Sequence, residues 1–274
     1  MLLRLLDCLK KKVAQKYLKD MIQLQGEDYG FSRSHGEASS VTITAEAVIN
    51  LIQSGEEGNS SIIQRAISFL WSLQKENGSW RENPKLPRDK IPFWSSTEKG
   101  VPILTADCIE ALVEAGYRND SRVVKAVSWL RRMQSSDGMW IALEDAKPND
   151  TEPDSTQRAI SALIKFGLSA ESTIIRSACK ALEKFIFTEA IEWAKTYPPT
   201  WPWIAALDGL AAAGYTVKNK AVQYALKNVL KQQQNDGGWP NGYELRVVPT
   251  LIGLGVISKE QAVEAIERIE GKKF

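Results

Sequence analysis

Three stretches of the chain share one pattern: RAISFLWSLQKENGSW at residues 65–80, KAVSWLRRMQSSDGMW at 125–140 and YALKNVLKQQQNDGGW at 224–239. In each stretch a glutamine is followed four residues later by a glycine and six residues later by a tryptophan. The glutamine and tryptophan pairs are Gln74 with Trp80, Gln134 with Trp140, and Gln233 with Trp239. Such recurrence is typical of folds built from copies of one structural unit. The sequence therefore predicts a repeat architecture.

A second pattern interleaves with the first and places a leucine seven residues, and a glycine eleven residues, after each of its starting points. The starting points are Thr44, Thr105, Thr156, Trp203 and Glu244; the leucines are Leu51, Leu112, Leu163, Leu210 and Leu251; the glycines are Gly55, Gly116, Gly167, Gly214 and Gly255. Apolar residues spaced by three, four and seven lie on one helix face. Glycine suits the positive φ that often follows a helix. The pattern predicts apolar helices near residues 42–54, 103–115, 154–166, 202–213 and 245–254.

Longer and more polar helices are predicted between them, near residues 3–25, 60–75, 120–135, 171–190, 217–233 and 258–270. A weaker copy of the first pattern, from Gln25 to Phe31, ends the first of these helices. Short apolar helices that alternate with long amphipathic ones bury their apolar faces when they form two concentric rings. We therefore expect an all-α fold, an α/α toroid of about eleven helices in an inner and an outer ring. No strand pattern competes with it, and residues 1–274 are expected to form a single domain.

Composition excludes several classes of protein. The 274 residues carry a formal net charge of +2, which is too balanced for a nucleic-acid binder. No run of 18 apolar residues is present, so no membrane-spanning helix is predicted. The three cysteines are far apart in the sequence, which favours a reducing, cytoplasmic location. The first 25 residues hold six basic and two acidic side chains. This segment is interpreted as the charged face of a packed helix, with peripheral contact to a membrane surface as the alternative.

The Gln-x-x-x-Gly-x-Trp copies resemble the QW repeats of triterpene cyclases. The fold that they imply is similar to squalene–hopene cyclase domains and to the β subunits of protein prenyltransferases. The resemblance covers nearly the whole chain. It implies that the repeated glutamine and tryptophan side chains tie outer helices to their neighbours and have a structural role. It also implies an isoprenoid small molecule as the ligand.

Class II terpene cyclases are similar to this chain at one further place. They carry an Asp-x-Asp-Asp or Asp-x-Asp-Thr-Thr signature ahead of an inner helix, and the matching residues here are Glu152-Pro153-Asp154-Ser155-Thr156. The resemblance places Asp154 at the proton donor and Glu152 at the assisting acid. Aromatic faces stabilise a carbocation, and the predicted substrate-binding residues are Phe93, Trp94, Trp201 and Trp203. The long connections at 81–102 and 141–153 are the predicted ligand entrance.

The same acidic residues have a purely structural interpretation, which the sequence favours over catalysis. Asp154 followed by Gln157 matches a capping box, in which the aspartate is the N-cap and the glutamine is the third helical residue. Pro153 and Glu152 also suit the start of a helix. On this interpretation the segment is another repeat unit with a good cap.

The prenyltransferase resemblance implies a zinc site made by an aspartate, a cysteine and a later histidine. Here Asp107 and Cys108 are adjacent, and the one histidine, His35, lies upstream of them. No Asp-rich diphosphate-binding motif is present, so magnesium is not implied. We therefore predict neither a metal nor another cofactor.

Two functions of different classes remain open. The leading one is binding of a polyprenyl or terpenoid hydrocarbon, with class II cyclisation started by protonation from Asp154. The alternative is a non-catalytic toroid that serves as a ligand- or protein-binding module, so the sequence leaves open whether the protein is an enzyme. Class II cyclases usually place their site between two helical domains. A homodimer, or a second helical domain or chain, is therefore expected to complete such a site.

Overall fold

The computed structural model describes residues 18–147, 150–235 and 237–258. Five helices correspond to the predicted apolar set: α3 (Val41–Gln53), α5 (Pro102–Glu114), α7 (Pro153–Phe166), α10 (Trp201–Ala212) and α12 (Glu244–Gly253). Four helices correspond to the longer set: α4 (Ser61–Ser72), α6 (Ser121–Arg132), α8 (Thr173–Thr188) and α11 (Lys220–Leu230). The predicted helices at 3–25 and 258–270 lie mostly outside the described residues.

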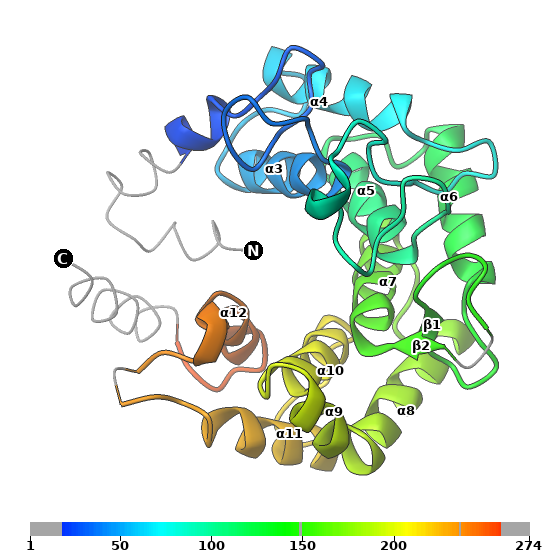
Figure 1. The fold of residues 1–274 in the computed structure, drawn as a ribbon. Coiled ribbons are helices and arrows are strands. Elements are labelled where there is room, and N and C mark those ends of the chain that lie inside the picture. Colours follow the sequence, from blue (N-terminus) through cyan, green and yellow to red (C-terminus); the bar gives the residue numbers. More distant parts are fainter. Residues whose placement is uncertain (1–17, 148–149, 236, 259–274) are drawn as a thin grey trace.

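The helices are arranged as the predicted toroid. In Figure 1, α3, α5, α7, α10 and α12 line the inside of an open ring, and α4, α6, α8 and α11 lie around its outside. Helix α5 packs between α3 and α7, and α7 packs in turn against α10. The prediction of an all-α toroid with inner and outer rings is confirmed for the described part of the chain.

The core lies between the two rings. The five repeated leucines are buried, with at most 4% of any of them exposed. All five glycines that follow the inner helices have positive φ, between 70° and 117°. Gly167 shows the reason clearly, because it caps α7 at a φ of 117°, where a side chain would be strained. Both sequence predictions, the apolar helix face and the glycine end, are confirmed.

The repeated glutamines and tryptophans connect neighbouring units. Gln134 Nε2 donates to the carbonyl of Gly138 in its own turn (2.8 Å) and to that of Ile174 in the next outer helix (2.9 Å). The Trp140 indole donates to the Leu130 carbonyl at 2.7 Å, near the end of α6, in addition to the backbone N–H of Met133. Gln74 and Trp80 make the same contacts one unit earlier. The structural role predicted for these side chains is confirmed for the first two copies, whose neighbouring units the structure describes.

Removing one of these glutamines should weaken the ring measurably. We expect Gln134→Ala to lower the free energy of unfolding by about 1–3 kcal/mol, because the carbonyls of Gly138 and Ile174 lose their shared donor. Urea denaturation measures the difference. Ser128→Ala is the control, since the Ser128 hydroxyl donates only to Val124 within the same helix. Equal stability of the two variants would contradict the connecting role of Gln134.

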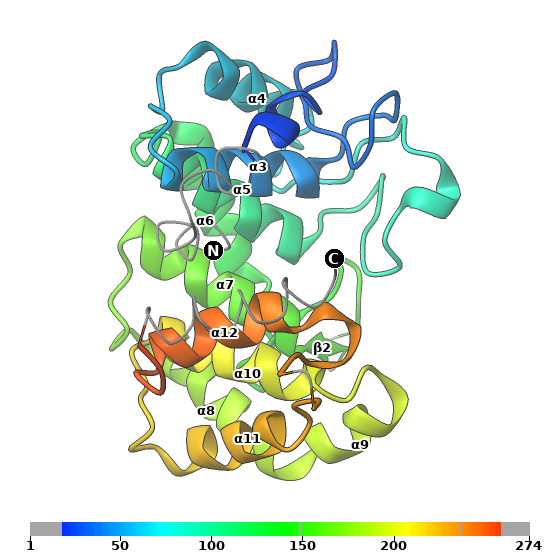
Figure 2. The same cartoon turned by 90° about the vertical axis from the view of Figure 1, so that its left-hand side faces the viewer.

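Two features were not predicted. A two-stranded antiparallel sheet joins β1 (Trp140–Ile141) to β2 (Thr151–Glu152), with Trp140 opposite Glu152. A short helix, α9 (Ala190–Thr196), follows α8. Two short 3₁₀ turns, Arg88–Lys90 and Pro240–Gly242, and a helical segment at 18–22 are also present. In the side view of Figure 2, the long segment between α4 and α5, strand β2 and helix α9 all lie toward the same end of the ring.

None of the described helices is both long enough and apolar enough to span a bilayer.

Candidate active site

Asp154 does not cap helix α7. The helix begins at Pro153, whose fixed φ suits the first helical position, and Glu152 is the N-cap, without a side-chain capping bond. Asp154 is therefore the second helical residue. Its Oδ1 accepts a long 3.5 Å hydrogen bond from the side-chain amide of Gln157. The predicted capping box is wrong, because the proline starts the helix before the aspartate and moves the carboxylate out of the N-cap position.

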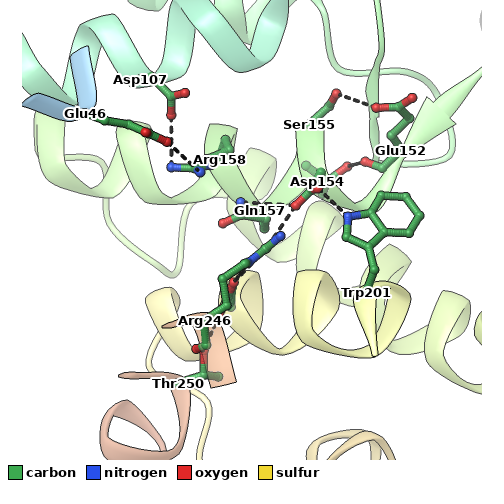
Figure 3. A network of polar contacts seen from close by, with 12 residues as sticks. Glu46, Asp107, Glu152, Asp154, Ser155, Gln157, Arg158, Trp201, Arg246 and Thr250 are labelled. Atoms are coloured by element: carbon green, nitrogen blue, oxygen red, sulfur yellow. Dashed lines mark hydrogen bonds and ion pairs between the residues drawn. The ribbon is translucent and has the colours of Figure 1, made fainter. Parts of the chain in front are cut away.

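The Asp154 carboxylate is instead held by two donors from helices later in the chain. Oδ2 accepts the indole N–H of Trp201, from α10, at 2.5 Å. Oδ1 accepts from Nη2 of Arg246, from α12, at 2.9 Å. Figure 3 shows both side chains converging on Asp154. Burial raises the pKa of this carboxyl, but the charge of Arg246 and the two hydrogen bonds outweigh burial, so its pKa lies below the usual value.

Arg246 is shared between two acids. The same Nη2 atom that contacts Asp154 also donates to Oδ2 of Asp208, on α10, at 2.8 Å, and Nε donates to that oxygen at 3.1 Å. The Thr250 hydroxyl donates to the other oxygen of Asp208. Burial raises the pKa of Asp208 despite these contacts. One guanidinium thus joins α7, α10 and α12 on the inner side of the ring.

Glu152 has a very different environment from Asp154, two residues away. Its Oε2 accepts one long hydrogen bond, 3.4 Å, from the Ser155 hydroxyl. Burial and the negative charge of Asp154 raise its pKa to about 7, and Asp150 acts in the same direction. Ser155 opposes this shift without cancelling it. At neutral pH this carboxyl therefore exchanges readily between its two protonation states.

A row of polar contacts joins α5 to α7 beside this site. Arg158 Nη1 lies 3.2 Å from Oδ1 of Asp107, and Nη2 lies 3.9 Å from Glu46. Two further pairs continue the row: Ser161 with Glu110, and Lys165 with Glu114. The Asp107 side chain is only 3% exposed, and its Oδ2 has no hydrogen-bond partner among the described residues. Burial, only partly offset by Arg158, raises the pKa of Asp107 to about 7.

Asp107 should make the stability of the protein depend on pH. A group whose pKa is higher in the folded than in the unfolded state stabilises the fold fully when the pH is below its pKa in the unfolded state. That contribution is lost as the pH rises through its pKa in the folded state. We expect the free energy of unfolding of Asp107→Asn, relative to that of the wild type, to rise by roughly 2–4 kcal/mol between pH 5 and pH 8. Urea denaturation at the two pH values measures the difference, and Glu152 contributes equally to both proteins. Parallel pH profiles would contradict this expectation.

The structure brings one of the four predicted aromatic residues to the acids. Trp201 contacts Asp154, and its ring stacks on Trp193 of α9 at 5.4 Å between centroids. Tyr197 completes this aromatic group, 5.0 Å from the Trp201 ring. Trp203 is buried and packs edge-on against Tyr224 of the outer helix α11. Trp94 packs against the core.

Phe93 is 86% exposed. Among the described residues, no hydrogen bond joins Phe93, Trp94 or Trp203 to Asp154. Their role in substrate binding remains a prediction. Trp193 and Tyr197, which lie beside Trp201, were not predicted as part of the site.

Asp107 and Cys108, two residues of the implied zinc site, have surroundings that differ from those of metal ligands. Asp107 contacts a guanidinium, and Cys108 is buried with a pKa raised well above the usual value, chiefly by burial. Within the described part of the chain, no three His, Cys, Asp or Glu side chains are grouped so as to hold a metal ion.

Arg246, Asp208 and Arg158 were missed by the sequence analysis, although the second pattern contains a signal for most of the network. Two residues after each of four starting points the chain has a charged side chain: Glu46, Asp107, Arg158 and Arg246. A charge at one fixed position of otherwise apolar helices indicates a shared polar surface. Asp208, at a different position in its helix, gives no such signal.

Comparisons with known proteins agree with this fold. A family model described as the prenyltransferase alpha-alpha toroid domain matches residues 1–138 and 64–194. The chain is 27% identical over 125 residues to squalene-hopene cyclase from Schizosaccharomyces japonicus, covering 43% of this chain and 19% of that protein. It is 29% identical over 82 residues to lanosterol synthase from Saccharomyces cerevisiae, covering 30% of this chain and 11% of that protein. The matches therefore span less than a fifth of either relative.

Solved structures of similar fold include the type II terpene cyclase MstE from Scytonema. A variant in complex with geranylgeranyl dihydroxybenzoate, its substrate, has a TM-score of 0.63 at 17% identity, covering 84% of this chain and 65% of that one. A protein from Actinoplanes gives a TM-score of 0.64 at 17% identity, covering 82% and 66%. These likenesses establish a terpene cyclase-like fold. With the family model matching most of its length, the chain belongs to the prenyltransferase alpha-alpha toroid domain family.

Proposed function

We propose that this toroid binds a polyprenyl or terpenoid hydrocarbon and cyclises it by protonation, as class II terpenoid cyclases do. The proton comes from the Glu152 and Asp154 pair, with Asp154 at the position of the family's acid. The similar proteins include squalene-hopene cyclase, and one similar structure holds a geranylgeranyl substrate. The site residues of this proposal are the two acids and the adjoining Trp201.

One observation carries the proposal. Two carboxyls two residues apart have pKa values shifted in opposite directions, Glu152 to about 7 and Asp154 below its usual value. Such divergence between neighbouring acids is a pattern that sites of acid–base catalysis use. Asp154, the acid with the lowered pKa, adjoins the aromatic group of Trp193, Tyr197 and Trp201. The faces of such rings stabilise a developing cation.

A specific observation favours the second candidate, a non-catalytic ligand- or protein-binding module. Arg246 holds Asp154 in its ionised form, and an ionised carboxylate has no proton to donate. The contacts from Asp107 to Arg158 and from Asp208 to Arg246 then serve only to hold inner helices together.

The remaining parts of the proposal concern organisation. We treat residues 1–274 as a single toroid domain that works with a second helical unit, either a further domain or chain or a second copy of this one. The support is that the similar terpene cyclase is longer, since only 65% of it is covered. A cytoplasmic location with peripheral membrane contact is a prediction from the sequence alone.

The test is incubation of the purified chain with geranylgeranyl diphosphate, squalene and 2,3-oxidosqualene, followed by product analysis. We expect a cyclised product from the wild type and much less from Asp154→Asn. Glu171→Gln is the control, because Glu171 is an exposed acid outside both connections of the predicted ligand entrance. No product from the wild type, combined with a rise in melting temperature on adding an isoprenoid, would favour the binding module. If the wild type gives no product and no isoprenoid changes its melting temperature, both the cyclase and the isoprenoid-binding module are excluded, and the protein-binding module remains.

A further inference from the structure

The hydrogen bonds of Asp154 leave little room for a proton. Oδ2 accepts from Trp201, and Oδ1 accepts from both Arg246 and Gln157. These three donors occupy three of the roughly four lone-pair sites of the carboxylate, so both sites on Oδ1 are filled and one site on Oδ2 remains. The Arg246 contact is also an ion pair, whose attraction is lost when the carboxylate is neutralised. The geometry is that of a fixed anion.

Glu152 has the opposite geometry. A single 3.4 Å contact from the Ser155 hydroxyl reaches Oε2, and no described cation pairs with the carboxyl. The charged groups that face it are Asp154, two residues later, and Asp150, before β2, and both are acids. From β1, the residue paired with Glu152 is Trp140, which carries no charge. Every charged neighbour thus favours the protonated form of Glu152, and its pKa of about 7 agrees with this geometry.

We infer that Glu152 is the proton donor of the site and that Asp154 is the fixed anion beside the developing cation. This reverses the roles that the motif assigns, and it rests on the proposed cyclase function. The helix start explains the reversal. Pro153 places Asp154 inside the first turn, within reach of α10 and α12, while Glu152 stays at the N-cap beside β1.

The step balances with an isoprenoid epoxide as the substrate class. The Glu152 O–H bond breaks and the proton bonds to the epoxide oxygen. The C–O bond then opens, and the electron pair of the next alkene forms a C–C bond. The final cation loses a proton to water, and Glu152 takes one up again, so the net change is an isomerisation. An epoxide oxygen has lone pairs that accept a hydrogen bond from Glu152 before transfer, and this suits a moderately weak acid better than a bare alkene does.

The experiment compares product formation from 2,3-oxidosqualene by the wild type, Glu152→Gln and Glu152→Asp. We expect the rate of product formation at neutral pH to be about 100-fold or more lower in Glu152→Gln than in the wild type, and Glu152→Asp to recover part of that rate. The wild-type rate should fall as pH rises through about 7. In Asp154→Asn, the rate of product formation that remains should fall at a lower pH than in the wild type, because the Asp154 charge helps to raise the pKa of Glu152. Glu171→Gln, at an exposed acid, is the matched control.

Infrared spectroscopy provides a readout that needs no substrate. The wild type should show a protonated-carboxyl band with a component that disappears between pH 6 and pH 8 and is absent from Glu152→Gln. The component from Asp107 should remain in that variant and be absent from Asp107→Asn. If the wild type forms product and Glu152→Gln forms it at the same rate, the assignment of Glu152 as the proton donor is overturned, while the proposed function stands. A protonated-carboxyl band that is as large in Glu152→Gln as in the wild type would do the same. No product from the wild type would overturn the proposed function beneath it.

Discussion

Replacing Arg246 with glutamine is expected to lower the free energy of unfolding at pH 7 by about 3–5 kcal/mol. The reason is that one guanidinium neutralises two carboxylates, Asp154 and Asp208, that are largely removed from water. Glutamine keeps a donor but not the charge. Both acids then lie in the ring with no cation between them, although Arg158 still acts on Asp154 from a greater distance.

The effect should depend on pH with a definite sign. The pKa of Asp154 is lowered in the folded wild type. This group therefore stabilises the fold when the pH is above its pKa in the unfolded state, and the contribution is lost as the pH falls through its pKa in the folded state. In Arg246→Gln burial is no longer opposed by the nearest cation, so both acids are expected to accept protons more readily. The deficit should therefore shrink between pH 7 and pH 4.

Urea denaturation of both proteins at the two pH values tests this expectation. Arg176→Gln is the control, because Arg176 is an exposed cation on the outer helix α8. A deficit that is the same at pH 4 as at pH 7 would show that Arg246 acts through packing and not through its charge.

Trp140→Ala is the second substitution with a large expected effect, a loss of about 3–5 kcal/mol. The side chain is completely buried, and its indole pairs a carbonyl at the end of α6. The backbone N–H of Trp140 also donates to the Thr156 hydroxyl, which ties the outer unit to α7. Trp140→Phe keeps most of the volume and should lose only about 0.5–1.5 kcal/mol, because the Leu130 carbonyl loses the indole donor but keeps the backbone N–H of Met133.

Phe93→Ala is the control for these two variants, since an aromatic side chain that is 86% exposed should change stability by less than about 0.5 kcal/mol. Thermal and urea unfolding measure all three. Because Trp140 pairs with Glu152 across the small sheet, Trp140→Ala should also disturb the position of that acid. A fully stable Trp140→Ala protein would contradict the connecting role of the repeated tryptophans.

The fold was predictable because its signals are local and repeated. Leu112 and Gly116 report one helix and its end, and four other units carry the same pair. Helix α9 was missed because Ala190–Thr196 belongs to no repeat. The capping box at Asp154 was a wrong prediction, because two local rules competed there and the proline prevailed.

The candidate site was less predictable because its contacts are distant in sequence. Asp154 and Arg246 are 92 residues apart, and no local pattern joins them. The motif found the two acids, Glu152 and Asp154, but their opposite environments follow from what α10 and α12 bring to one of them.

The contacts between α5 and α7 determine which unit stands beside which. Acids at Asp107, Glu110 and Glu114 meet Arg158, Ser161 and Lys165, and each pair is 51 residues apart in the chain. Units with the same backbone therefore differ in the sign of the charge they present to a neighbour. If α5 were duplicated in place of α7, acid would face acid at three successive levels. A shuffled order of modules would thus be disfavoured even though every module kept its own hydrophobic pattern, so the circular order is itself encoded in the sequence.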